Sequence, residues 1–206
     1  MKRNFSRHTY YLIEKLKSDD KEVRENAAHD LGEWGDVRKP IVLALTHALT
    51  DSEISVRAMA ARALCELGQN SEPVLALLRE MLDDKEASYT SLAVYALGCL
   101  GRKAPQFVGK IIIKLTDKDL WLRATAAEAL GKLGRSSEQV IGALIKALED
   151  EYPLVGISAA EASGKLGKGS AEVVGALKRQ LQGESGRMRK AAKEALGKLG
   201  EEQPQG

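Results

Sequence analysis

A glycine recurs every 33 residues along this chain of 206 residues, with no insertion between successive copies. Its positions are Gly35, Gly68, Gly101, Gly134, Gly167 and Gly200. A leucine keeps the same step from Leu16 to Leu181, and an alanine keeps it from Ala27 to Ala192. A fixed period of this length is the mark of stacked structural repeats, which bury their apolar faces against their neighbours. The sequence therefore predicts six consecutive copies of one small repeat.

Each repeat reads as two helices joined by a polar turn. In the fourth repeat, the apolar residues from Phe107 to Leu115 are spaced as one helix face, and a polar turn follows at residues 116–119. A second apolar face then runs from Leu122 to Leu133. The periodic glycine comes next, where a left-handed helix cap is expected. The predicted fold is all-α, a right-handed α-α superhelix (solenoid) of six 33-residue helix pairs.

The predicted repeats fill almost the whole chain. We expect one solenoid over residues 1–200 and a polar C-terminal tail over residues 201–206. The six repeats are expected at residues 4–35, 36–68, 69–101, 102–134, 135–167 and 168–200.

Composition indicates where such a protein works. The two cysteines, Cys65 and Cys99, make no disulfide framework, which favours a reducing compartment. The sequence has no apolar run long enough for a signal peptide or a membrane span. We therefore predict a cytoplasmic monomer that does not contact membranes.

The repeated residues resemble the HEAT repeat, in its short phycobilisome-lyase-like subclass. The second repeat shows the pattern from Asp51 through Val56-Arg57 and Ala60-Ala61 to Leu67-Gly68. The resemblance implies a ladder of hydrogen bonds between a turn aspartate and a helix arginine of successive repeats. The ladder residues would be Asp51, Asp84, Asp117 and Asp150 with Arg24, Arg57, Arg123 and Arg189. Thr90 and Gly156 occupy the arginine position in the third and fifth repeats, so the ladder should be weaker there.

Residues that differ between repeats are the candidates for function. In HEAT-like proteins, the outward positions of the second helices line the concave face of the stack. The side chains that we expect to bind a partner there are Arg62, Tyr95, Trp121, Glu128, Leu154, Ile157 and Glu161. Exposed aromatic residues beside charged ones are typical of protein-binding hot spots. The alternative is that Trp121 packs locally on Leu120 or Tyr152.

The sequence contains no catalytic constellation. The histidines His8, His29 and His47 do not share a register, so we expect no metal site and no cofactor. Deoxyhypusine hydroxylase, a relative within the HEAT-like group, holds iron through His-Glu pairs. The matching positions here are Glu25-Asn26, Ala58-Met59, Ser91-Leu92, Ala124-Thr125, Ile157-Ser158 and Lys190-Ala191. The predicted function is therefore a non-catalytic scaffold or regulatory subunit that binds another protein or peptide.

Two alternative functions stay open at this point. The family also contains phycobilin lyase subunits, so the chain is a candidate accessory subunit for attaching or removing bilins. The sixth repeat has a local charge of +5, which suits either phosphate binding or a solvated capping repeat. The overall net charge of +2 argues against nucleic acid as the main partner.

The fifth repeat departs most from the common pattern. Pro153 removes a backbone donor, Gly156 adds backbone entropy, and Ser163 replaces a leucine. We therefore expect local opening of the stack to begin in this repeat.

Overall fold

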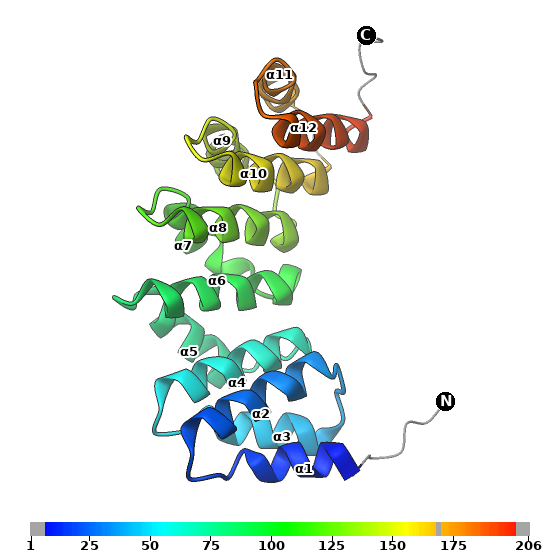
Figure 1. Ribbon diagram of the computed structural model, residues 1–206. Helices are drawn as coiled ribbons and strands as arrows, with labels where there is room; N and C mark the ends of the chain where they lie inside the picture. The colour runs from blue at the N-terminus through cyan, green and yellow to red at the C-terminus, as the bar shows by residue number, and fades with distance from the viewer. Residues whose placement is uncertain (1–6, 168–169, 201–206) are drawn as a thin grey trace. The chain divides into compact units, whose positions relative to one another are not determined.

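The computed structural model describes residues 7–167 and 170–200, and these residues form a series of helix pairs (Figure 1). The first helices of the pairs are α1 (Arg7–Lys15), α3 (Lys39–Ala48), α5 (Glu72–Leu82), α7 (Val108–Lys114), α9 (Glu138–Ala147) and α11 (Ala171–Gln180). The second helices are α2 (Lys21–Glu33), α4 (Ile54–Glu66), α6 (Ala87–Leu100), α8 (Leu120–Leu133), α10 (Pro153–Leu166) and α12 (Gly186–Lys198). The predicted all-α repeat class is confirmed.

The chain divides into two compact units, Met1–Leu100 and Gly101–Gly206. The division falls one residue before the expected boundary between the third and fourth repeats, and each unit contains three helix pairs. We call them the first unit and the second unit. A single solenoid over residues 1–200 stays a prediction.

Small residues set the spacing between second helices inside each unit. A Cβ atom added to Gly32 of α2 would lie 2.8 Å from the Cβ of Ala63 in α4. In the second unit, a Cβ on Gly131 would lie 2.7 Å from the Cα of Ala162. Such contacts are too short for any side chain, so glycine permits the close approach of these helices.

Local capping signals fix where the helices begin and end. All six periodic glycines have positive φ, between 55° and 76°. Ser137 and Ser170 are N-caps of α9 and α11, and their hydroxyl oxygens accept hydrogen bonds from the backbone N–H groups of Val140 and Val173. Ser71, which the sequence also offers as an N-cap, precedes α5 but makes no side-chain hydrogen bond to it, so the serine caps hold at two of the three predicted positions.

The first helix of the fourth repeat is shorter than the apolar pattern predicted. Two turns of 3-10 helix, Gly101–Lys103 and Pro105–Phe107, precede α7. Pro105 has no backbone N–H to continue a hydrogen-bonded helix from the preceding residues. Phe107 is nevertheless buried, so the apolar face is kept while the helix begins late.

The fifth repeat is less disturbed by its proline than we expected. Pro153 is the first residue of α10, a position where the missing N–H has no helical partner to lose. Gly156 is buried, and a Cβ there would lie 3.2 Å from the carbonyl oxygen of Leu148 and 3.4 Å from the Sδ of Met188. Ser163 is fully buried, and its hydroxyl donates to the carbonyl of Ala159 at 2.8 Å. Of the three changes, Ser163 is the one that removes apolar burial.

Candidate functional site

The predicted partner-binding residues divide between the two units. Arg62 and Tyr95 belong to the first unit, whereas Trp121, Glu128, Leu154, Ile157 and Glu161 belong to the second.

In the first unit, Arg62 of α4 is held by several neighbours at once. Its Nε donates to Glu66 at 2.9 Å, and its Nη2 lies 3.6 Å from Glu33. The guanidinium also lies over the ring of Tyr95 from α6, 5.0 Å from the ring centroid. Arg62 therefore links α4 to α2 through the ion pair with Glu33 and to α6 through the cation–π contact with Tyr95.

The pKa values of both Tyr95 and Arg62 are raised, so neither side chain changes its charge near neutral pH. Burial raises the pKa of Tyr95 to about 12, so the phenol stays protonated. Burial alone would lower the pKa of Arg62, but the hydrogen bond to Glu66 and the charges of Glu66 and Glu33 together outweigh it, and the pKa is raised. The cluster therefore presents a fixed cation and a neutral phenol, which suits recognition better than proton transfer.

In the second unit, Trp121 projects from the first turn of α8. Asp119 is the N-cap of this helix, and its carboxylate accepts hydrogen bonds from the backbone N–H groups of Trp121 and Leu122 at 2.7 Å and 3.3 Å. The Trp121 side chain is 67% exposed. Within the described residues, its ring stacks on no other ring, and the Tyr152 ring lies instead beneath the Arg123 guanidinium at 5.5 Å.

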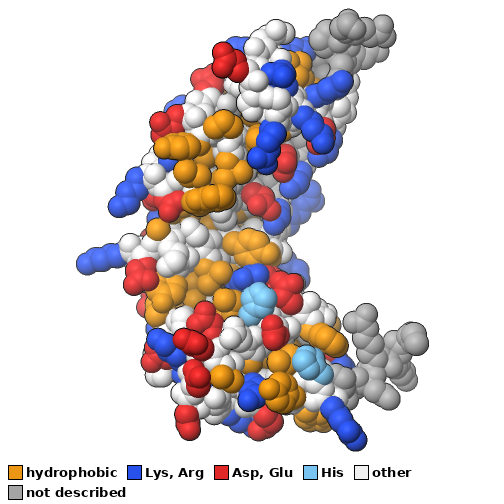
Figure 2. All heavy atoms as spheres, in the orientation of Figure 1, with side chains coloured by type: hydrophobic (Ala, Val, Ile, Leu, Met, Phe, Trp, Pro, Cys, Tyr) orange, Lys and Arg blue, Asp and Glu red, His pale blue; other side chains and the backbone are white. Residues whose placement is uncertain are grey.

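Apolar and acidic residues accompany Trp121 on the neighbouring helix. Leu154 and Ile157 of α10 are partly exposed, and Leu154 holds the same repeat position as Trp121. Figure 2 shows hydrophobic side chains gathered over α8 and α10. Glu161 is exposed, whereas Glu128 pairs with Lys132 at 2.7 Å. We call Trp121, Leu154 and Ile157 the Trp121 patch.

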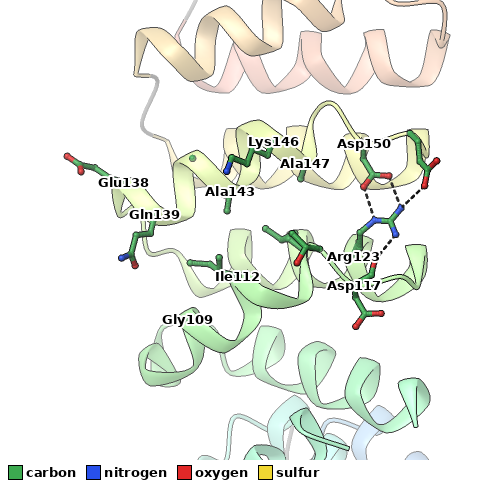
Figure 3. Close-up of a pocket in the computed structure, with 14 residues that line it drawn as sticks. Gly109, Ile112, Asp117, Arg123, Glu138, Gln139, Ala143, Lys146, Ala147 and Asp150 are labelled. Carbon is green, nitrogen blue, oxygen red and sulfur yellow. Dashed lines mark hydrogen bonds and ion pairs between the residues drawn. The ribbon is translucent and has the colours of Figure 1, made fainter. Parts of the chain in front are cut away.

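The structure also shows what the predicted ladder residues contact. Arg24 donates through Nε and Nη2 to both carboxylate oxygens of Asp51, at 2.7 Å and 2.8 Å. Arg123 forms the same paired contact with Asp150, at 2.7 Å and 2.9 Å (Figure 3). One bidentate rung of this kind therefore lies within each unit.

The other predicted ladder residues bond locally. No hydrogen bond joins Arg57 to Asp84 within the part of the chain that the structure describes, and nothing there explains the difference. Asp84 and Asp117 accept from the backbone N–H groups two residues later, and Arg189 bonds to backbone carbonyls only. All four arginines share one contact that the sequence did not reveal. Each donates from Nη1 to the backbone carbonyls of the residues six and five positions earlier. These hydrogen bonds tie the arginine to the turn that precedes its own helix.

The rungs lower the pKa of their carboxyl groups. The hydrogen bond from Arg24 lowers the pKa of Asp51 below its ordinary value of 3.8. Burial by itself would raise the pKa of Asp150, but the hydrogen bonds from Arg123 and the backbone of Tyr152 outweigh it, and the pKa is lowered. Both carboxylates are therefore charged at neutral pH.

The structure contains a groove that sequence reasoning missed. It lies between α7 and α9 of the second unit, has a volume of about 870 Å³, and ends at the Arg123–Asp150 rung (Figure 3). Gly109 and Gly142 line it, and a Cβ at either would meet nothing within 4 Å. The sequence did contain a signal for the groove. One position of the first helix is glycine in the last three repeats, at Gly109, Gly142 and Gly175, whereas the first two repeats have the large residues Tyr10 and Leu43 there.

The described residues include no group of three or more histidine, cysteine, aspartate or glutamate side chains placed to hold a metal ion. None of the helices described combines the length and the apolar composition of a membrane span. Of the basic residues of the sixth repeat, Lys168 lies outside the described residues. The basic side chains of α12 are all exposed.

The stacked helix pairs, with variable side chains on their exposed faces, define a helical repeat protein. The sequence profile of HEAT repeats matches residues 11–98 and 109–197, so the chain belongs to the HEAT-repeat family. The phycobilisome-lyase-like subclass stays a prediction. No curated protein sequence matches the chain at a significant level.

Solved structures share the fold. An engineered protein matches 95% of this chain over 97% of its own length, with a TM-score of 0.64 and 22% identity. A designed armadillo repeat protein in complex with peptide (KR)4 matches 94% of this chain over its whole length, with a TM-score of 0.65 and 18% identity. Human deoxyhypusine hydroxylase in complex with glycerol matches 93% over 84% of its length, with a TM-score of 0.50 and 21% identity. Identities this low show a common fold alone.

Proposed function

We propose that this protein is a non-catalytic interaction module that binds a partner protein or peptide through the exposed face of its second helices. The observation that carries the proposal is the exposure of Trp121, 67% in a position where no other repeat has an aromatic residue. The stack does not need a tryptophan there, because five other repeats form the same turn without one. An exposed tryptophan is expensive to leave in water and is enriched at binding hot spots.

Two more observations support this role. The Trp121 patch places apolar side chains beside Glu161 and the Glu128–Lys132 pair, the arrangement of an apolar centre with a charged rim. The fold is also compatible with peptide binding, since the designed armadillo protein with this fold is a complex with a peptide.

Truncation of the tryptophan tests the proposal. We expect Trp121→Ala to leave the melting temperature almost unchanged, because the ring makes few contacts, and to weaken partner binding at least about tenfold. The partner would first be captured from lysate of the source cell and identified. Its affinity for wild type and variant would then be measured by calorimetry with purified proteins.

A matched control is available on a first helix, α7, instead of a second helix. Ile113 of α7 is 68% exposed, so Ile113→Ala removes a similarly exposed apolar side chain from a different face. Equal binding by wild type and Trp121→Ala, or equal loss in both variants, would contradict the proposal. A Trp121→Ala variant that melts several degrees lower would show instead that the ring serves local packing.

A further inference from the structure

Two grooves lie at the same repeat position in the two units. The smaller groove, of about 390 Å³, lies between α1 and α3, and the larger lies between α7 and α9. Their apolar linings correspond residue for residue at a spacing of 99 residues, three repeats. Ile13 and Leu16 of the first correspond to Ile112 and Leu115 of the second. The first groove therefore serves as an internal reference for the second.

Side-chain size differs between the two grooves. The positions of Gly109 and Gly142 correspond to Tyr10 and Leu43 in the first unit, whose side chains are 61% and 57% exposed. Helix packing does not require either glycine, because a Cβ at each would meet nothing within 4 Å. The second groove is thus left open for the backbone of an occupant to approach α7 and α9 closely.

Charge differs as well. Glu138, Glu151 and Asp117 line the second groove, whereas the corresponding residues of the first unit are Lys39, Ser52 and Ser18. In Figure 3, Glu138 lies at one end of the groove and Asp117 at the other. The sequence of the second unit carries eighteen basic and thirteen acidic residues, a net charge of +5. The acidic groove is therefore a local feature that opposes the charge of its own unit.

The cations in the groove do not cancel this acidity at its ends. Arg123 is buried, and its guanidinium contacts Asp150, two backbone carbonyls and, at 3.8 Å, the exposed Glu151. This single cation faces three carboxylates at its end of the groove, those of Asp117, Asp150 and Glu151. Lys146 belongs to the last turn of α9, and its side chain lies between Glu138 at one end of the groove and Asp117 at the other (Figure 3). A cationic occupant is consequently attracted at both ends and repelled in the middle.

We infer that the groove between α7 and α9 binds a peptide segment with an apolar centre flanked by lysine or arginine. The flanking cations would meet Glu138 at one end and Asp117 and Glu151 at the other. The apolar centre would cover Ile112 and Ala143. The ten residues of α9 rise about 15 Å, so an extended centre of about five residues spans the groove.

The test uses a synthetic probe and the full-length protein. The probe is the fluorescein-labelled peptide KRVLAVLRK, and its binding is followed by fluorescence anisotropy at low ionic strength. We expect saturable binding that weakens as salt is added, because exposed charges are screened. The comparison peptides are EEVLAVLEE and a peptide of alternating lysine and arginine. Both should bind at least about tenfold more weakly, the second because it places cations beside Lys146.

Residues borrowed from the first unit make the decisive variants. Gly109→Tyr with Gly142→Leu fills the groove with the side chains of the corresponding positions, and Glu138→Lys reverses the charge at one end. Each should weaken binding of KRVLAVLRK at least about tenfold. The control is Glu80→Lys, which makes the same charge change at an exposed site in the first unit. Circular dichroism melting confirms that the filled variant is folded.

The possible results separate cleanly. Equal affinity of wild type and the filled variant for KRVLAVLRK, or equal affinity of the lysine-flanked and glutamate-flanked peptides, overturns the inference. Failure of KRVLAVLRK to bind also overturns it. Trp121→Ala should bind the probe as wild type does, so this groove and the Trp121 patch are tested independently.

Discussion

Two helix glycines of the second unit have opposite surroundings, and this difference predicts opposite effects of the same substitution. A Cβ on Gly131 would lie 2.7 Å from the Cα of Ala162, whereas a Cβ on Gly142 would meet nothing within 4 Å. We expect Gly131→Ala to destabilise the protein by about 1–3 kcal/mol, since the backbone of α10 must move. Gly142→Ala should stabilise it by up to about 1 kcal/mol through helix propensity. Urea unfolding measures both, and a shift of the two midpoints in the same direction would show that packing does not decide the sign.

The ladder rungs predict how stability depends on pH. The folded-state pKa of Asp150 lies below the ordinary value of 3.8, so its charged form contributes stability that is fully present above that value. This contribution is lost as the pH falls through the lowered folded-state pKa. We therefore expect Asp150→Asn to melt below wild type at pH 6, and the difference to shrink below about pH 4. Glu80→Gln, at an exposed site, should show no such convergence; a constant gap between Asp150→Asn and wild type would contradict the prediction.

At the scale of single helices, α10 should be the least protected second helix of the second unit. Ser163 fills a buried position that holds leucine in the other repeats, and the loss of leucine burial costs a few kcal/mol in typical cores. Pro153 adds nothing to this weakness because it is the first residue of α10. Hydrogen exchange should therefore open the amides of α10 before those of α8. Equal protection of the two helices would mean that the Ser163–Ala159 hydrogen bond and the tight packing of Gly156 make up the difference.

The helices and their caps could be predicted because each depends on local chemistry. The glycine at Gly134 and the serine at Ser137 act within a turn of their own positions, so a single repeat contains the information. The absence of a rung between Arg57 and Asp84 could not be predicted, since it depends on side-chain positions in two repeats. The outward position of Trp121 could be predicted from its place in the helix register, whereas only the structure shows that its ring stays exposed instead of packing on Leu120 or Tyr152.

The groove was hidden from sequence reasoning for a physical reason. A glycine on the exposed face of a helix and a glycine at a tight helix contact look alike in a sequence, and only the neighbouring atoms distinguish Gly142 from Gly131. Glu138, read from the sequence, is an ordinary first-turn acid of α9. Its place at one end of a groove, with Asp117 at the other end, depends on how α7 and α9 pack.

At the scale of the whole molecule, the two tryptophans report on the two units separately. Trp34 lies in the first unit and Trp121 in the second. The stability of a repeat protein is close to a sum over repeats and their contacts, so unlike units need not unfold together. We expect fluorescence of a Trp34→Phe variant, which reports Trp121, to change at lower urea than that of a Trp121→Phe variant. The second unit should unfold first because it contains Ser163 and the unpacked glycines. Coincident transitions, matching circular dichroism, would show that both units unfold as one.

The glycine contacts inside the second unit have a consequence for protein engineering. Gly131 approaches Ala162 in the same way that Gly164 approaches Ala195, so the joint between α8 and α10 and the joint between α10 and α12 are interchangeable parts. A gene that encodes residues 135–167 twice in succession would insert one helix pair between two joints that already fit it. Chain length in this protein is therefore an adjustable quantity, and each added repeat should add one exposed second-helix face.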